Sequence, residues 1–242
     1  MAQSDPPHPS GIPDNSTSPD VILIADDDEF FRMALRTILT KIVEGAQIQE
    51  TSSLDEAVEY LSETGTVTLA LFDLNMPGME SAANLRAVRE CFPQTLVAVV
   101  SASRRRADIL LALEAGAHGY IPKRLGVVEL AAAIQTVRSG AIYVPASITD
   151  LSGTEGEPNR PLNASVAARP AASEMGLTPR QRDVLELIVQ GMSNKEIARA
   201  LGLGEGTVKV HVAALFRVLG VTSRTGAAAA GIRMLELRPS QH

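Results

Sequence analysis

The sequence has 242 residues, enough for two modest domains at about 100–200 residues each. Apolar residues make up 45% and charged residues 21%, as is typical of soluble globular proteins. No apolar run approaches the roughly 20 residues that a membrane-spanning helix needs, and the single Cys91 cannot form an internal disulfide. The net charge of −6 hides an asymmetry: residues 1–150 carry 11 Lys/Arg against 20 Asp/Glu, and residues 176–242 carry 9 against 5. The final quarter is therefore the part suited to binding nucleic acid.

Residues 1–19 are polar and rich in Pro, without the basic start and apolar core of a secretion signal. We predict a disordered arm there and a cytoplasmic, reduced protein with no membrane partner.

Five short apolar runs alternate with amphipathic stretches between residues 20 and 140. The runs are Val21–Ala25, Ile48–Thr51, Val67–Phe72, Leu96–Val100 and Gly119–Pro122, and the helices between them are expected at about 29–43, 54–63, 81–91, 105–115 and 127–138. Three runs are continuously apolar, which indicates strands buried on both faces. This repetition predicts an α/β doubly wound domain with a parallel sheet over residues 20–145. Residues 146–175 have Pro, Gly, Ser and Ala without periodicity, which predicts a flexible linker.

Helix signals return in residues 176–242, the second predicted domain. Thr178 and Pro179 are typical of a helix start, and Gly191 ends that helix. Ser193 begins a capping box for a short helix that Gly202 stops. A longer helix follows, with its buried stripe at Val208, Val212, Leu215 and Leu219, and a fourth helix is expected from Thr225 to Leu237. A short helix, a turn and a longer helix can place an exposed face in the major groove of DNA.

Carboxylates gather where strands of the predicted sheet end. Asp26, Asp27 and Asp28 follow the first strand, and Asp73 follows the third. Ligands of open α/β sheets bind at the carboxyl ends of strands, and oxygen ligands without His or Cys favour Mg²⁺. The alternative is that Asp28 caps the next helix and the other carboxylates are solvated strand ends.

Three further residues favour a functional site. Ser101 ends the fourth strand, and Lys123 follows the fifth, three positions after Tyr120. A carboxylate nucleophile, a metal and a fixed ammonium suffice for phosphoryl transfer. Taken singly, Ser101 is more simply a polar strand end and Lys123 a surface lysine.

The segments VILIADDDEFFR, LFDLNMPGM, VVSAS and GAHGYIPK resemble the signature segments of response-regulator receiver domains, over about residues 20–138. The resemblance implies a flavodoxin-like fold with strand order 2-1-3-4-5. It also implies that a cognate sensor histidine kinase phosphorylates the protein. By this resemblance, Asp73 is the phosphoacceptor. Mg²⁺ would be bound by Asp27, Asp73 and the Asn75 carbonyl, with Asp26 acting through water. Lys123 would contact the phosphoryl group, and Ser101 and Tyr120 would form the switch pair.

Two features depart from that family's pattern. Ser81 stands where a Gly is frequent after the Met-Pro-Gly turn, at the start of the third helix. Arg104, Arg105 and Arg106 follow the fourth strand, where three cations oppose the dipole of the next helix. They form either a solvated loop or a contact with a partner or with the phosphoryl group.

The segment from Gly176 to Val221 resembles the LuxR-type helix-turn-helix, with SNKEIA and GTVKVH at the family's spacing. Behind a receiver domain, this is the arrangement of the NarL/FixJ family. The helix starting near Glu205 would then be the recognition helix, binding promoter DNA. Lys209 and Val210 match its base-reading positions, and the residues placed for phosphates are Asn194, Lys195, Thr207 and Arg217.

The sequence leaves alternatives at this end of the chain. The recognition helix could be an ordinary amphipathic helix with a polar outer face. Ala213 stands where some relatives place a polar or basic residue, and Gly204 replaces the usual Ser cap. The last helix, rich in Ala and Gly, pairs with its twin in that family, which implies a homodimer when phosphorylated; otherwise it only covers the small core.

Two rival functions remain. One is an Mg²⁺-dependent phosphohydrolase using Asp73, but Asn75 stands two residues later, where a second general acid would be expected, and no Gly-rich phosphate cradle follows any strand. We therefore predict a regulator rather than an enzyme. The other is a protein-interaction switch with a vestigial DNA-binding half, which the basic C-terminal quarter and Lys209 oppose. Phosphorylation could act by relieving a blockage of the DNA-binding face or by driving dimerisation.

Overall fold

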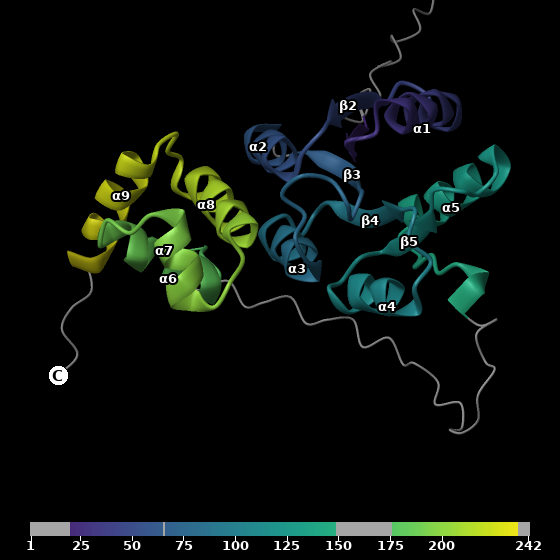
Figure 1. Cartoon of the computed structure of the whole chain (residues 1–242). Coiled ribbons are helices and arrows are strands. Elements are labelled where there is room, and N and C mark those ends of the chain that lie inside the picture. Colours follow the sequence, from purple (N-terminus) through teal and green to yellow (C-terminus); the bar gives the residue numbers. More distant parts are fainter. Residues whose placement is uncertain (1–19, 65, 149–175, 237–242) are drawn as a thin grey trace, which may run out of the picture.

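The structure is a computed structural model that describes residues 20–64, 66–148 and 176–236 (Figure 1). The predicted arm, residues 1–19, lies outside the described residues, as do residues 149–175 of the predicted linker, so both stay predictions. Among the described residues, no helix has the length and apolar character needed to cross a membrane.

A parallel five-stranded sheet forms the first domain, with the strand order β2-β1-β3-β4-β5. The strands are β1 (Val21–Ala25), β2 (Gln47–Thr51), β3 (Val67–Phe72), β4 (Leu96–Ser101) and β5 (Gly119–Pro122). The continuous apolar runs of β1, β3 and β4 are buried on both faces, as parallel strands between two helix layers must be. The predicted doubly wound, flavodoxin-like fold is confirmed.

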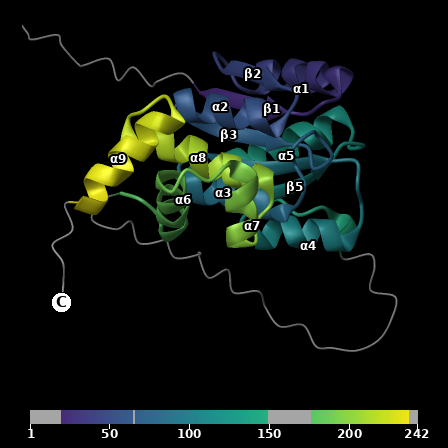
Figure 2. The ribbon, with the colours of Figure 1, turned by 60° about the vertical axis from the view of Figure 1, so that its left-hand side comes forward.

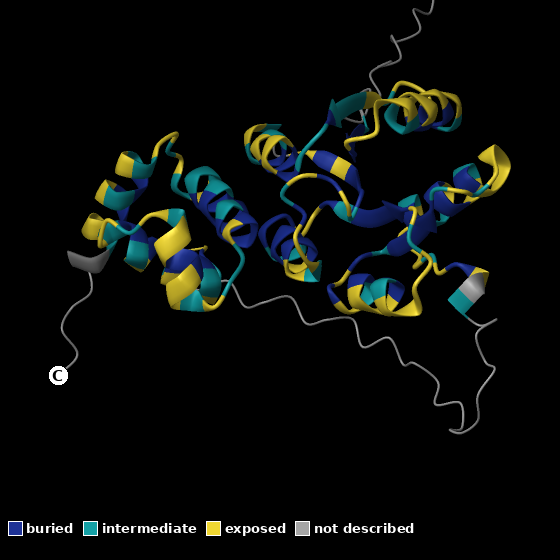
Figure 3. Cartoon of the chain, in the orientation of Figure 1, coloured by how far each residue is buried: buried dark blue, intermediate teal, exposed yellow. Residues whose placement is uncertain are grey.

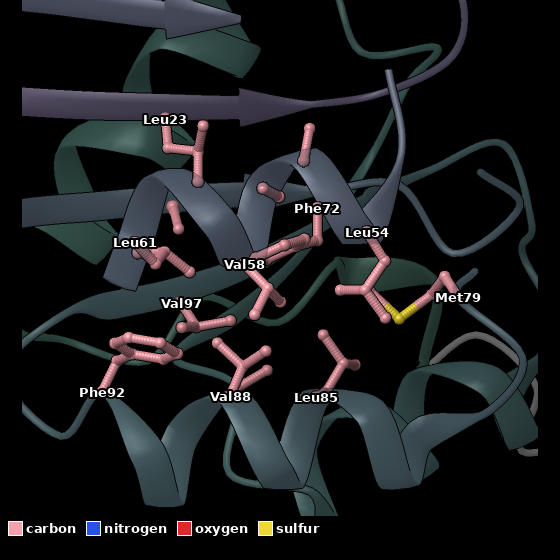
Figure 4. Packing of buried hydrophobic residues seen from close by; sticks show 14 of the residues in the cluster. Leu23, Leu54, Val58, Leu61, Phe72, Met79, Leu85, Val88, Phe92 and Val97 are labelled. Atoms are coloured by element: carbon pink, nitrogen blue, oxygen red, sulfur yellow. The ribbon is translucent and has the colours of Figure 1, made fainter. Parts of the chain in front are cut away.

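Five helices cover the two faces of the sheet. Alternate residues of each strand point to opposite faces, so two cores form. One core packs β1 residues such as Ile22 against α1 (Glu29–Ile42) and α5 (Val127–Arg138). The other packs residues such as Leu23 and Phe72 against α2 (Leu54–Thr64), α3 (Ala82–Cys91) and α4 (Arg106–Glu114). Figure 4 shows this second core between α2 and α3.

Two polar caps begin helices beside the carboxyl ends of the strands. The Asp28 side chain accepts hydrogen bonds from the amides of Phe30 and Phe31, which makes it the N-cap of α1, as the simpler interpretation of that residue expects. Ser81 is the N-cap of α3 and forms a reciprocal capping box with Asn84. The Ser81 departure from the family pattern therefore serves the start of α3.

The chain after α5 stays against the sheet for a short distance. Tyr143 pairs with the edge of β5, since its amide donates to the His118 carbonyl and its carbonyl accepts from the Tyr120 amide. A short 3₁₀ helix at Ala146–Ile148 follows, and Ile148 packs on the core that contains α2, α3 and α4. The contact of Ile148 with this core lies three residues beyond the predicted domain end at 145.

The C-terminal region contains α6 (Pro179–Val189), α7 (Asn194–Leu201), α8 (Glu205–Leu219) and α9 (Arg224–Glu236) around a small core of their own. Thr178 and Ser193 form the two expected capping boxes, and Gly202 ends α7 in the left-handed conformation. The predicted short helix, turn and longer helix are therefore α7, residues 202–204 and α8. Gly204 caps α8 without a side-chain hydrogen bond, as the sequence indicates.

Candidate functional site

Three carboxylates meet at the carboxyl ends of β1 and β3, which are neighbours in the sheet. The Asp73 amide donates to the Ala25 carbonyl at 2.8 Å, and this ladder bond places Asp73 beside Asp26. Asp26, Asp27 and Asp73 each offer an oxygen atom, and these atoms lie within 4.8 Å of one another. Asp26 and Asp73 are buried, whereas Asp27 is exposed. The sheet thus gathers the predicted acidic cluster, with one side open to solvent.

Lys123 follows β5 and reaches across the sheet edge to this cluster. Its Nζ lies 2.7 Å from an Asp26 carboxylate oxygen and 3.2 Å from one of Asp73. Burial raises the pKa of Asp26 even though the hydrogen bond from Lys123 opposes this effect. Burial also acts to lower the pKa of Lys123, but the hydrogen bond to Asp26 and the charge of Asp73 outweigh it, so that pKa is raised. The ammonium offsets part of the repulsion between the two carboxylates.

The cluster has the chemistry of a hard-cation site. The Asp73 Oδ1 atom is buried and has no hydrogen-bond partner among the described residues. All three gathered side chains offer oxygen and none offers nitrogen or sulfur, as Mg²⁺ prefers. Asn75, whose carbonyl the resemblance assigns as a ligand, is exposed three residues after the end of β3. The residues present therefore fit a magnesium ion.

The predicted switch residues lie on the two neighbouring strands β4 and β5. Ser101 is buried at the end of β4, and its hydroxyl accepts the Ser103 amide at 3.2 Å. Tyr120 is fully buried, and its hydroxyl donates to the Ser103 carbonyl at 2.9 Å. Burial raises the pKa of Tyr120. Both side chains thus converge on the loop that follows β4.

The three arginines of that loop are exposed. Arg105 pairs with Asp108 at 2.9 Å, and this carboxylate lies in the first turn of α4, where it complements the helix dipole. Among the described residues, none of Arg104, Arg105 and Arg106 forms an ion pair with the acidic cluster. The exposed loop agrees with the simpler interpretation, and a contact of this run with a partner or with the phosphoryl group stays a hypothesis.

Helix α8 packs on both domains at once. Val208, Val212 and Leu215 face the core of the C-terminal region, as predicted, and Leu219 is half-buried. The opposite side packs on α2 and α3, where Val210 and Ala214 join the core of the first domain. Figures 1 and 2 show α8 lying beside α2 and α3, and Figure 3 shows its buried inner faces. We call this the closed arrangement.

Polar contacts extend along the covered side of α8. Lys209 forms a 2.5 Å ion pair with Asp55 at the start of α2. Arg217 donates to the carbonyl of Cys91 at 2.7 Å and lies 4.7 Å from the centre of the Phe92 ring. These contacts hold two of the predicted DNA-binding residues against the first domain.

The middle of this surface is buried and contains a cysteine and a histidine. The Cys91 sulfur lies 3.4 Å from Nδ1 of His211, and Gln181 of α6 donates to the same sulfur at 3.8 Å. Burial lowers the pKa of His211 to about 4 and raises the pKa of Cys91 to about 12. Both groups are therefore neutral at neutral pH, which suits their place between the two domains.

The expected exposed face of the recognition helix is thus covered by protein. Thr207 is buried and its hydroxyl has no hydrogen-bond partner among the described residues. Asn194 accepts a hydrogen bond from Arg224 at 3.0 Å, and Lys195 is exposed. The roles of Asp55, Cys91 and His211 in this surface were not predicted, because their contacts join residues far apart in the chain. Small side chains on the outer face of α8, at Ala213 and Ala214, were the available signal for close packing.

Comparisons with known proteins identify both domains of the chain. The model of the response regulator receiver domain matches residues 22–135, and that of the bacterial regulatory proteins of the luxR family matches residues 175–230. The glycerol metabolism activator of Pseudomonas putida is 36% identical over 85% of this chain and 92% of its own. The nitrate/nitrite response regulator protein NarL of Escherichia coli strain K12 is 33% identical over 88% of this chain and 95% of its own.

The chain belongs to the two-component response regulators of the NarL type, in which a receiver domain precedes a LuxR-type helix-turn-helix, and it is a transcription factor. That family consists of DNA-binding regulators rather than metabolic enzymes. The solved structure of the RcsB response regulator of Salmonella typhimurium has a TM-score of 0.51 at 20% identity, covering 92% of this chain and 100% of that one. At this identity the likeness supports the fold alone.

Proposed function

We propose that phosphorylation of Asp73 releases α8 from the receiver domain so that α8 can bind promoter DNA. One observation carries this proposal: Lys209, to which the resemblance assigns base reading, is ion-paired with Asp55 of the receiver domain. A helix cannot pack on α2 and α3 and lie in a DNA groove at the same time. Of the two modes of control left open by the sequence, the closed arrangement favours relief of a blockage.

The phosphorylation step follows from the acidic cluster. An Asp73 carboxylate oxygen attacks the phosphorus of a phosphohistidine on the sensor kinase, the phosphorus–nitrogen bond breaks, and the histidine leaves. Asp27, Asp73 and the Asn75 carbonyl would hold Mg²⁺, with Asp26 acting through water, and the bound ion would supply charge neutralisation for the phosphoryl oxygens. Lys123, already beside Asp73, contributes a second positive charge. Ser101 and Tyr120 respond to the new group through the loop at Ser103 that both contact.

DNA recognition then uses the uncovered face of α8. Lys209 can donate to guanine acceptors, and Val210 can contact a thymine methyl group. Phosphate contacts, which fix register without reading sequence, are the roles that the resemblance assigns to Arg217, Thr207, Asn194 and Lys195. Thr207 gains a partner for the hydroxyl that lacks one in the closed arrangement. Pairing of α9 with its twin would make the DNA-bound form a homodimer.

Phosphoryl uptake tests the first half of this function. With acetyl phosphate and Mg²⁺, the full chain is expected to gain one phosphoryl group that hydroxylamine removes, as it does from acyl phosphates. Asp73→Asn, and the parent chain in a metal chelator, should gain none in intact-mass measurements. Equal phosphorylation of Asp73→Asn would contradict the assignment of the phosphoacceptor.

A further inference from the structure

The turn that follows the phosphoacceptor touches the first turn of α8. This turn, residues 76–81, contains the Met-Pro-Gly sequence and connects β3 to α3. We call it the Met-Pro-Gly turn. It is held from both sides: the Leu54 amide donates to the Pro77 carbonyl at 2.9 Å, and the Asn84 side chain donates to the Gly78 carbonyl at 3.4 Å. Its conformation is therefore tied to the starts of both α2 and α3.

Gly78 is required at the centre of this turn. Its φ of +85° is in the left-handed region, where glycine has no steric penalty. A Cβ there would also lie 3.1 Å from Cβ of Leu54. The backbone of the turn is thus closely packed on α2.

Gly206 of α8 lies directly against this turn. A Cβ at Gly206 would lie 2.8 Å from the Gly78 carbonyl oxygen and 2.8 Å from the Asn84 side-chain nitrogen. Both atoms belong to the receiver domain, and one is backbone that cannot move aside as a flexible side chain can. The closed arrangement consequently requires a residue without a side chain at position 206.

We propose that the seat of Gly206 on the Gly78 carbonyl is the latch of the closed arrangement, and that the state of Asp73 reaches α8 through the Met-Pro-Gly turn. This inference rests on the proposed function, because it describes how phosphorylation of Asp73 would release α8 from the receiver domain. The turn begins three residues after Asp73 in the chain, so it connects Asp73 directly to the contact with Gly206. A small shift of the Gly78 carbonyl towards Gly206 would make the two residues clash and so displace α8.

Cys91 provides a built-in reporter of the latch. It is the only cysteine of the 242-residue chain, and its thiol is covered by His211 of α8 and Gln181 of α6. Release of α8 uncovers this thiol and removes the burial that raises its pKa, so alkylation accelerates. The rate of alkylation by iodoacetamide therefore measures opening without DNA.

The test compares the full-length parent chain with Gly206→Ala and Gly204→Ala, each with and without beryllofluoride and Mg²⁺ as a phosphoryl mimic. In Gly206→Ala, the clash with the turn should accelerate alkylation without the mimic by about tenfold or more, and the mimic should add little. Within α8 itself, Ala favours the helix. Gly204→Ala is the matched control, because its Cβ would meet the far end of the flexible Glu80 side chain. It should behave like the parent.

Three results would overturn the inference in distinguishable ways. Slow alkylation of Gly206→Ala without the mimic would show that the seat does not hold α8. Equal acceleration in Gly204→Ala would show that the start of α8 is generally sensitive rather than seated at Gly206. If the mimic leaves alkylation of the parent chain unchanged while Gly206→Ala is alkylated rapidly, the link to Asp73 and the proposed function are contradicted. The contact between Gly206 and Gly78 would still hold α8 in place.

Discussion

Replacement of Lys123 by Ala is expected to lower the free energy of unfolding by about 3–5 kcal/mol in the absence of Mg²⁺, the usual cost of breaking a buried ion pair. The Lys123 side chain is 15% exposed and contacts Asp26 and Asp73, whose side chains are 2% and 4% exposed. Without the ammonium, two buried carboxylates repel each other across the sheet edge. Urea unfolding of the full chain in a metal chelator measures the loss.

Magnesium should restore part of that stability, since a cation that binds the folded cluster stabilises it by mass action. Arg124→Ala is the matched control: it removes the same charge one residue later, from an exposed side chain, and should change stability by less than about 0.5 kcal/mol. If Lys123→Ala and Arg124→Ala unfold at the same urea concentration, Lys123 does not neutralise the cluster.

Replacement of Lys209 by Ala should have the largest effect on recognition of DNA. In the phosphoryl-mimic state, affinity for the preferred sequence is expected to fall by about 1–3 kcal/mol, and the preference at one base position should relax. The mimic is needed because Lys209 also holds Asp55 in the closed arrangement. That ion pair is half-exposed, so its loss should contribute little to the change in DNA affinity. Sequencing of the bound fraction of a randomised duplex library measures both quantities.

Lys195→Ala separates base reading from phosphate contact. Lys195 is exposed on α7, and its loss should weaken binding to all sequences alike and reduce the salt dependence by about one charge. A uniform loss in Lys209→Ala, with every base preference intact, would make Lys209 a phosphate contact instead.

The sequence predicted the receiver fold and its acidic corner because local rules determine both. Continuous apolar runs such as β1 and β3 predict parallel strands, and parallel strands bring their carboxyl ends to one edge. Asp26, Asp73 and Lys123 meet there because they directly follow three strands of one sheet. Caps such as Ser193 were equally predictable, since a capping box lies within one helical turn.

The covered face of α8 could not be predicted in the same way. Apolar periodicity identified the stripe of Val208, Val212 and Leu215, which packs within the C-terminal region. Val210 and Ala214 form a second stripe, and small apolar residues suit either a thymine methyl or a protein surface. The contact between Cys91 and His211 joins residues 120 positions apart, and no local pattern encodes it. Tertiary packing determined which partner this face meets.

The affinity of the full chain for DNA, measured with and without beryllofluoride, tests the central claim most directly. The probe is a duplex selected by the mimic-treated chain from a randomised library, titrated by fluorescence anisotropy at one salt concentration. The mimic should tighten binding by about 5- to 150-fold, the usual range of coupling between two sites. Asp73→Asn should stay at the weak affinity under both conditions. Equal affinity of the parent chain with and without the mimic would contradict control of α8 through Asp73.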